Sequence, residues 1–323
     1  MNFRNLKAAV FSGTLMLGGA ATGVMANQSI PDQYPDSLLY SAPVEVIPNV
    51  WTSIGQTAPG NYENAGHNNN LSFIVTGDGV VVVNGGASWK LAEALHDEIV
   101  KITDQPVKLV IDENGQGHAF LGNSYWADQG VPILAHVDTA HEIEERGDFS
   151  LQALQRYAKE RAENTRVVGP DETFEDKKVI EMGDMTIEVL YLGHAHSPGD
   201  TQVWLPEQKL VIAGDMAFHE RMLPIFPDTI VKDWIETWET EFEELGALYV
   251  IPGHGHPTNM DQVRRYTRDY LVYLREKVGE HIDNGGDLSG AYYIDQEAYK
   301  SLDTFEELAT KNAGRVFEQM EWE

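Results

Sequence analysis

The chain has 323 residues, enough to bury one substantial core as a single large domain or as two smaller ones. It carries 23 Lys and Arg against 51 Asp and Glu, which gives a formal net charge of −28. A surface this acidic repels phosphate backbones and anionic lipid, so the charge excludes nucleic acid as a partner. The sequence contains no cysteine, so it offers neither a disulfide nor a thiolate ligand. Any metal site must therefore use histidine and carboxylate, and the composition leaves the oligomeric state open.

The first residues have the pattern of a secretory signal peptide. Arg4 and Lys7 precede an apolar stretch over 8–21, and the small residues before Asn27 suit a cut near Ala26. The apolar stretch has fewer than about 18 unbroken residues, which argues against a retained membrane helix. We therefore expect residues 1–26 to be removed, no stable membrane insertion afterwards, and a periplasmic or secreted protein.

The N-terminal half alternates β-branched runs with helical periodicity. The strands that these runs predict are bounded by Gly, Asn and Asp turn signals, and the apolar residues of the predicted helices recur at helical spacing. We predict strands at 44–51, 71–76, 80–83, 107–111 and 131–136, with helices at 88–102 and 120–129 and helical structure over 140–163 interrupted near Gly147 and Asp148.

The C-terminal half begins with an antiparallel meander and ends in helices. Predicted strands lie at 178–192 (two strands around Gly183 and Asp184), 201–205, 209–213 and 248–251, and predicted helices at 230–245 and 260–282. We expect a lead-in at 27–43 and one domain over 44–286. Residues 287–323 are expected to form a helical appendage packed on the same domain.

Four potential metal ligands each follow a predicted strand. Loops at strand ends are common places for chemistry, and side chains from distant strands can converge at one edge of a sheet. Imidazole and carboxylate suit zinc, and also iron or manganese. The four residues are His118, His196, Asp215 and His254.

The residues around these ligands carry a family resemblance. The segments 193–200 (GHAHSPGD), 213–215 (AGD) and 252–255 (PGHG) resemble the later ligand motifs of the metallo-β-lactamase superfamily. The resemblance covers about residues 44–254 and implies an α/β fold, a four-layer αββα sandwich with the metal at one edge. It also implies that Asp215 is the bridging aspartate and that His118, His196 and His254 are metal ligands. Segments 218–222 and 234–238 resemble a periplasmic branch, the metallohydrolases associated with sulfur oxidation and quinoprotein systems.

The first ligand motif departs from the family pattern T-H-x-H-x-D-H. Residues 113–118 read ENGQGH, and matching His118 to the last histidine puts the first two histidines on Glu113 and Gly115 and the aspartate on Gly117. Glycine has no donor atom, so the resemblance implies a reduced site with one ion per chain, zinc first. Three protein ligands and a water suffice for a catalytic zinc site.

The resulting hypothesis is a periplasmic metal-dependent hydrolase of an ester, thioester, lactone or related bond. It would act on a small-molecule substrate through a metal-activated water, with Asp215 and Glu113 as catalytic residues. Asp112 is a second candidate base. The alternative is a catalytically inactive binding protein on the same fold, which the glycines at 115 and 117 favour. Mononuclear iron chemistry on sulfur ranks last and β-lactam hydrolysis is disfavoured.

Other polar residues near these motifs have weaker functional patterns. His194 and His256 form H-x-H pairs with predicted ligands, and His219 could enter the pocket. His67 lies in a polar, turn-forming cluster. Asp200 is expected to fix the turn after His196 rather than to transfer protons.

Overall fold

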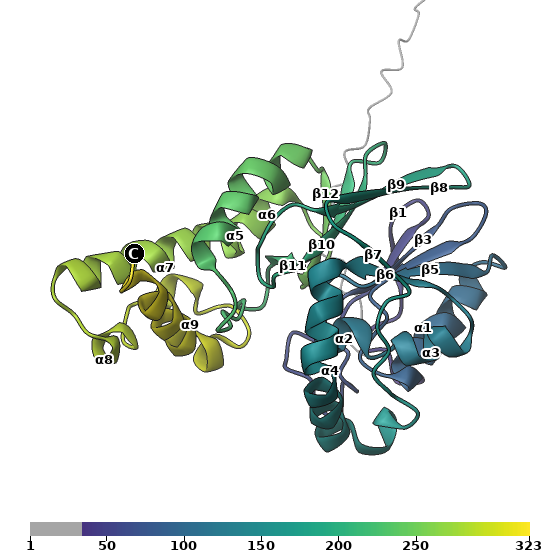
Figure 1. The fold of residues 1–323 in the computed structure, drawn as a ribbon, viewed down its shortest axis with the longest axis horizontal. Helices are drawn as coiled ribbons and strands as arrows, with labels where there is room; N and C mark the ends of the chain where they lie inside the picture. The colour runs from purple at the N-terminus through teal and green to yellow at the C-terminus, as the bar shows by residue number, and fades with distance from the viewer. Residues whose placement is uncertain (1–33) are drawn as a thin grey trace, which may run out of the picture. The chain divides into compact units, whose positions relative to one another are not determined.

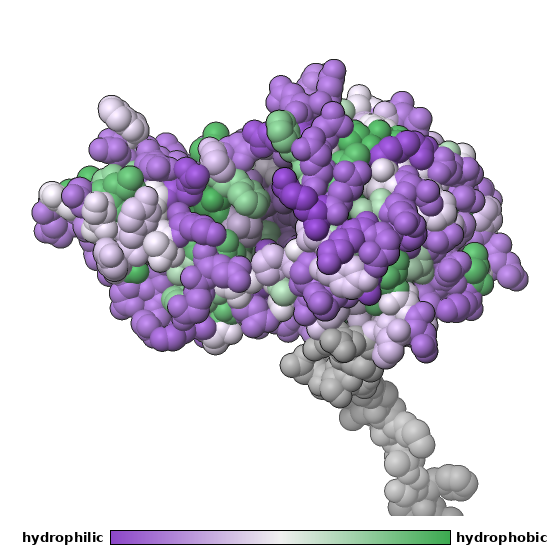
Figure 2. Space-filling model, turned by 90° about the horizontal axis from the view of Figure 1, so that it is seen from below, coloured by the Kyte–Doolittle hydropathy of each residue, from purple (hydrophilic) through white to green (hydrophobic). Residues whose placement is uncertain are grey.

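The computed structural model describes residues 34–323, so the predicted signal peptide and the start of the lead-in lie outside the described residues. Two mixed sheets organise this part of the chain (Figure 1). Within residues 34–323, no helix is both long and apolar enough to cross a membrane. Figure 2 shows one face of the molecule covered largely by hydrophilic residues, as the acidic composition leads one to expect.

The first sheet has the order β1-β2-β3-β4-β5-β6-β7. Its first four strands pair antiparallel and the later pairs, β4 with β5, β5 with β6 and β6 with β7, are parallel. The strands are β1 (Val44–Ile47), β2 (Val50–Ser53), β3 (Leu71–Val75), β4 (Val80–Val83), β5 (Val107–Ile111), β6 (Ile133–His136) and β7 (Glu172–Phe174). The helices of this half are α1 (Trp89–Ile102), α2 (Gly117–Phe120), α3 (Asn123–Asp128) and α4 (Val137–Ala158).

The second sheet has the order β12-β11-β10-β9-β8. The predicted meander is confirmed: β8 to β11 pair antiparallel in sequence, and β12 then adds parallel to β11. The strands are β8 (Lys177–Met182), β9 (Met185–Tyr191), β10 (Thr201–Leu205), β11 (Leu210–Phe218) and β12 (Tyr249–His254). The helices are α5 (Val231–Thr237), α6 (Met260–Tyr266), α7 (Arg268–Asp283), α8 (Leu288–Ala291) and α9 (Phe305–Met320).

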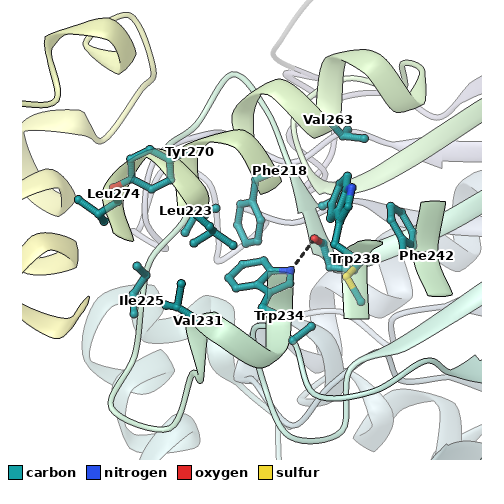
Figure 3. Packing of buried hydrophobic residues seen from close by; sticks show 14 of the residues in the cluster. Phe218, Leu223, Ile225, Val231, Trp234, Trp238, Phe242, Val263, Tyr270 and Leu274 are labelled. Atoms are coloured by element: carbon teal, nitrogen blue, oxygen red, sulfur yellow. Dashed lines mark hydrogen bonds between the residues drawn. The ribbon is translucent and has the colours of Figure 1, made fainter. Parts of the chain in front are cut away.

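The alternation of side chains along the strands builds four layers. In β4, Val81 and Val83 join a buried cluster between the sheets, while Val80 and Val82 face the opposite way and pack with α1 and α3. The second sheet buries its outer face against the helices of its own half, where Phe218, Trp234 and Trp238 form the centre of a large cluster (Figure 3). The predicted αββα sandwich is therefore confirmed.

Helix α9 extends the cluster on the second sheet. Ala313, Val316 and Phe317 are buried with Tyr270 and Leu274 of α7. The buried amide of Asn312 also donates a hydrogen bond of 2.8 Å to the carbonyl of Leu223. The last residues thus hold the segment that follows β11, which matters for the site.

Three predicted elements were wrong in detail. The predicted strand 44–51 is a hairpin, because Asn49 turns the chain with a φ of 70°. Helix α4 runs through Gly147 without interruption. The glycine does not end the helix; it is there because a side chain at this position would collide with Val167. The predicted helix 260–282 is interrupted at Thr267. The hydroxyl of Thr267 forms hydrogen bonds with the backbone N–H and carbonyl of Phe218 at this point.

Candidate metal centre

The potential ligands converge from both sheets. His118 lies in α2 beyond the end of β5, His196 lies between β9 and β10, and His254 is the last residue of β12. Asp215 lies inside β11 rather than after it, because β11 continues to Phe218. The strand bends at Gly214, whose φ is 57° and whose register against β12 is irregular. Asp215 is nevertheless at the centre of the ligands.

Three of these side chains could hold one ion. One donor atom each from His118, Asp215 and His254 lie within 4.8 Å of one another. His118 Nε2 is 3.5 Å from Asp215 Oδ2, and His254 Nε2 is 3.3 Å from Asp215 Oδ1. Asp215 Oδ1 and His118 Nε2 are buried atoms without a hydrogen-bond partner in the described part of the chain. Unpartnered imidazole and carboxylate donors at this spacing fit a small divalent cation.

His196 approaches the same carboxylate but stands apart from that trio. Its Nδ1 is 3.6 Å from Asp215 Oδ2 and 3.0 Å from the side-chain nitrogen of Gln116. Its ring packs against Phe226 and Trp234, with centroid distances of 5.2 and 5.6 Å. The aromatic wall fixes the ring with Nδ1 toward the site. His196 is thus a fourth, more distant contact of Asp215.

Two residues that sequence reasoning missed, Asn114 and Gln116, fill the rest of the pocket. The Asn114 amide donates to Asp215 Oδ2 at 3.1 Å, and Gln116 contacts His196. Gly115 and Gly117 face the other way, because a side chain on either would meet Glu142 or Ser150 of α4. The sequence spacing could have identified these two residues. Asn114, Gln116 and His118 are two residues apart, as are the two histidines and the aspartate of the H-x-H-x-D motif.

This geometry favours a register one residue later than the sequence match. The two motif histidines then correspond to Asn114 and Gln116, and His118 stands at the aspartate position. The last motif histidine corresponds to Ala119, which is buried. In this register the amides of Asn114 and Gln116, rather than Glu113 and Gly115, stand in place of the two imidazoles.

Glu113 is buried beside the trio. Its Oε1 is 3.7 Å from His118 Nε2, and a Cβ on Gly214 would clash with its Oε2, so the glycine makes room for the carboxyl. Burial, followed by repulsion from Asp215 and Asp200, raises the pKa of Glu113 well above its usual value, with partial relief from the amides of Asn84 and Asn69. Asp112, the other candidate base, points instead to Asn123, which donates to its Oδ2 at 2.6 Å.

The charge states of Asp215, His196 and His254 suit metal binding. Burial raises the pKa of Asp215, but the surrounding side chains of His118, His196 and His254 together lower it well below its usual value. Burial lowers the pKa of His196 and of His254 to about 4. At neutral pH, Asp215 is therefore ionised and these two imidazoles are neutral, which are the forms that ligate metals.

The remaining candidates have hydrogen-bonding or ion-pair contacts of their own. His194 contacts the carbonyl of Asp228 at 3.1 Å, and His219 Nε2 lies 2.6 Å from the backbone carbonyl of His256. His256 pairs with Glu220 at 2.8 Å. His67 is buried and accepts from the backbone of Tyr40.

Asp200 holds the turn after His196. Its Oδ2 accepts a hydrogen bond of 2.7 Å from the backbone of Ser197, and Asn114 lies 3.4 Å from its Oδ1. Burial, followed by the charge of Asp215, raises its pKa well above the usual value. These contacts agree with the turn-fixing role that the sequence suggested.

Comparisons with known proteins agree with this geometry. A profile described as the Metallo-beta-lactamase superfamily matches residues 118–254. A metallo-β-lactamase type 2 from Bacteroides fragilis is 23% identical over 193 residues, covering 56% of this chain and 70% of that protein. Another from Bacillus cereus is 22% identical over 211 residues, covering 64% and 73%.

Solved structures show the same fold. A metallo-β-lactamase from Pontibacter korlensis gives a TM-score of 0.58 at 20% identity and covers 71% of this chain and 98% of that one. Two structures of the DIM-1 metallo-β-lactamase give TM-scores of 0.57 and 0.56 at 17% identity, each covering 72% of this chain and 96% of that one. Members of the matched superfamily are generally metal-dependent hydrolases, typically with zinc. The profile match, the relatives, the sandwich and the converging His–Asp–His set together support membership of this chain in the metallo-β-lactamase superfamily.

Proposed function

We propose that this protein is a hydrolase of an ester, thioester, lactone or related bond that uses one divalent ion, zinc first, held by His118, Asp215 and His254. The observation that supports it best is the convergence of these donors, with Asp215 Oδ1 and His118 Nε2 buried and unpartnered. Buried polar atoms normally have a partner, so an ion is the natural occupant. Iron and manganese accept the same ligands.

The pocket's own residues divide the work. When bound, the ion would act as a Lewis acid and lower the pKa of water toward about 7. Glu113 is the group placed to accept the proton of the attacking water, since its buried carboxyl lies 3.7 Å from Nε2 of the ligand His118. The water oxygen bonds to the carbonyl carbon, the bond to the leaving oxygen or sulfur breaks, and Glu113 returns the proton to the leaving group.

The Asn114 side of the pocket supports a single ion. Carboxamides are neutral, and the amide nitrogens of Asn114 and Gln116 already lie against Asp215 and His196. The Asn114 amide thus donates to Asp215 Oδ2, the oxygen with which Asp215 could bind a second cation. The relatives named metallo-β-lactamases suggest β-lactams as a further substrate class, but the amides at 114 and 116 make this chain's pocket a different one.

The second candidate is a metal-free binding protein. The amides favour it, because they satisfy part of the pocket by hydrogen bonds without an ion. We further propose a periplasmic location, supported by the charged and apolar pattern of the first 26 residues.

Elemental mass spectrometry tests the metal centre first. Protein purified from the periplasm without chelator or added metal is expected to carry about one ion per chain. Hydrolysis would then be assayed on a p-nitrophenyl ester, an aryl thioester, a γ-lactone and the chromogenic β-lactam nitrocefin. No ion and no uptake of zinc, iron or manganese would overturn the proposal in favour of the binding protein. Two ions would show that the amides do not prevent a second site.

A further inference from the structure

Arg221 is a buried cation in direct contact with the metal-ligand set. Its side chain lies just beyond β11, the residue is 8% exposed, and its Nη1 donates a hydrogen bond of 3.2 Å to Nδ1 of His254. Its Nε has no hydrogen-bond partner in residues 34–323. The nearby carboxylates of Asp215 and Glu307 balance its charge. A guanidinium therefore sits behind one of the three proposed ligands.

The C-terminal segment fixes Arg221 in place. The preceding residue, Glu220, has a φ of 64°, and its carbonyl accepts a hydrogen bond of 2.8 Å from the backbone of Asp303. On the other side, the backbone of Met222 donates to the carbonyl of Asp303 at 2.9 Å. One residue of the C-terminal segment thus bonds the backbone on both sides of Arg221. The backbone on both sides of Arg221 is therefore held by the fold, which keeps the side chain in contact with His254.

This contact has the wrong polarity for a metal ligand. Guanidinium only donates, so His254 Nδ1 must accept, and the single proton of the neutral ring must lie on Nε2. Nε2, which then carries the proton, lies 3.3 Å from Asp215 Oδ1. A metal at Nε2 needs a lone pair there, which moves the proton to Nδ1, where it would face the donor of Arg221. Metal-bound histidines normally give their second N–H to a carboxylate or carbonyl.

We propose that Arg221 is a positioning residue that opposes the metal. It holds His254 as the Nε2–H tautomer and thereby weakens metal binding by His118, Asp215 and His254. This inference rests on the proposed function, because it takes those three residues as the metal site. It adds that the ion binds less tightly than it would to a His254 whose Nδ1 faced an acceptor, and that Arg221 keeps its hydrogen bond to His254 in the metal-free pocket.

Zinc titration with a competing fluorescent chelator tests the inference without any activity assay. In Arg221→Gln the side-chain oxygen can accept the Nδ1 proton of His254, so we expect zinc to bind at least about tenfold more tightly at unchanged stoichiometry. Arg221→Lys keeps a cationic donor and should stay within about threefold of the wild type. Arg166→Gln removes the same charge from an exposed pair with Asp128 and should change nothing.

The possible results separate the inference from the proposed function. Equal affinity in the wild type and Arg221→Gln, both folded by circular dichroism, would overturn the inference alone. Zinc binding by Arg221→Gln only would support the inference and refute a metal-dependent native activity. Binding by neither would refute both.

The tautomer itself can be observed. Nitrogen-15 spectra of metal-free, histidine-labelled protein should show His254 as the Nε2–H form, with the signal assigned by its loss in His254→Asn. An Nδ1–H tautomer would contradict the inference whatever the zinc affinities are.

Discussion

The two sides of the pocket around Asp215 have different chemistry. On one side, His118 and His254 present imidazole nitrogens 3.5 and 3.3 Å from the carboxylate. On the other, Asn114 donates an amide hydrogen to the same carboxylate, and Gln116 contacts His196. The first side offers donors that suit a cation, whereas the second presents amide hydrogen-bond donors. A site can therefore keep its shape while half of it changes from metal chemistry to hydrogen bonding.

The two sides of the pocket meet at the carboxylate of Asp215, whose two oxygens have different surroundings. Asp215 accepts from the amide with Oδ2, while Oδ1 has no hydrogen-bond partner in the described residues. One oxygen is thus occupied by the protein and the other is available. This asymmetry is the physical basis for expecting one ion instead of two.

Removing the shared carboxylate should have the largest effect. Asp215→Asn keeps the shape but loses the only charged ligand of the trio, so we expect zinc affinity to fall at least about 100-fold, measured by chelator competition. Asp228→Asn, which removes a carboxylate paired with Arg146, is the control and should keep its zinc. Full zinc retention by Asp215→Asn would place the ion elsewhere.

Glu113→Gln separates binding from chemistry. The amide is isosteric but cannot accept a proton, so hydrolysis of the best substrate should fall by about 10²- to 10⁴-fold while zinc content stays constant. Steady-state rates and elemental analysis of the same preparation measure both. Loss of zinc along with activity would make Glu113 a ligand, which its 3.7 Å distance from His118 makes worth testing.

Restoring imidazoles on the amide side tests the comparison from the other direction. Asn114→His with Gln116→His would join His196 as three nitrogen donors, so we expect the ion content to rise from about one to about two per chain. The double alanine variant at the same positions removes the amides without adding ligands and should remain at about one. A double histidine variant that also remains at one would mean that these side chains do not define a second ion site.

Sequence reasoning recovered the elements whose signals are local. Runs of β-branched residues bounded by turn residues predicted most strands, and the placement of ligands near strand ends brought His118, Asp215 and His254 to one pocket. These predictions needed no knowledge of distant contacts. The same holds for Asp200, whose bond to Ser197 spans three residues.

The features that escaped prediction depend on long-range packing. Gly115 could be recognised as facing α4 only once Glu142 was known to lie against it. The place of Arg221 is set by the backbone of Asp303, 82 residues later in the chain. Neither contact leaves a periodic pattern in the sequence. The whole first motif, with Asn114, Gln116 and His118, was therefore misaligned by one residue, while Asp215 and His254 were not.

Asp112 should have the smallest effect on the metal centre, because this buried carboxyl lies next to Glu113 in the chain but bonds Asn123. Burial raises its pKa from 3.8 to about 7, so between these values the folded state keeps a proton that the unfolded chain has released. The free energy of unfolding should therefore fall as pH rises through this window, by about 1.4 kcal/mol per unit, with no further change above it.

Asp112→Asn removes this pH-dependent contribution to the free energy of unfolding and adds a pH-independent cost for a buried amide. Chemical denaturation at pH 5, 6, 7 and 8 should show the variant gaining on the wild type up to pH 7 and then running parallel. Zinc content should be the same in both, and identical pH slopes would mean that Asp112 titrates as an exposed carboxyl does.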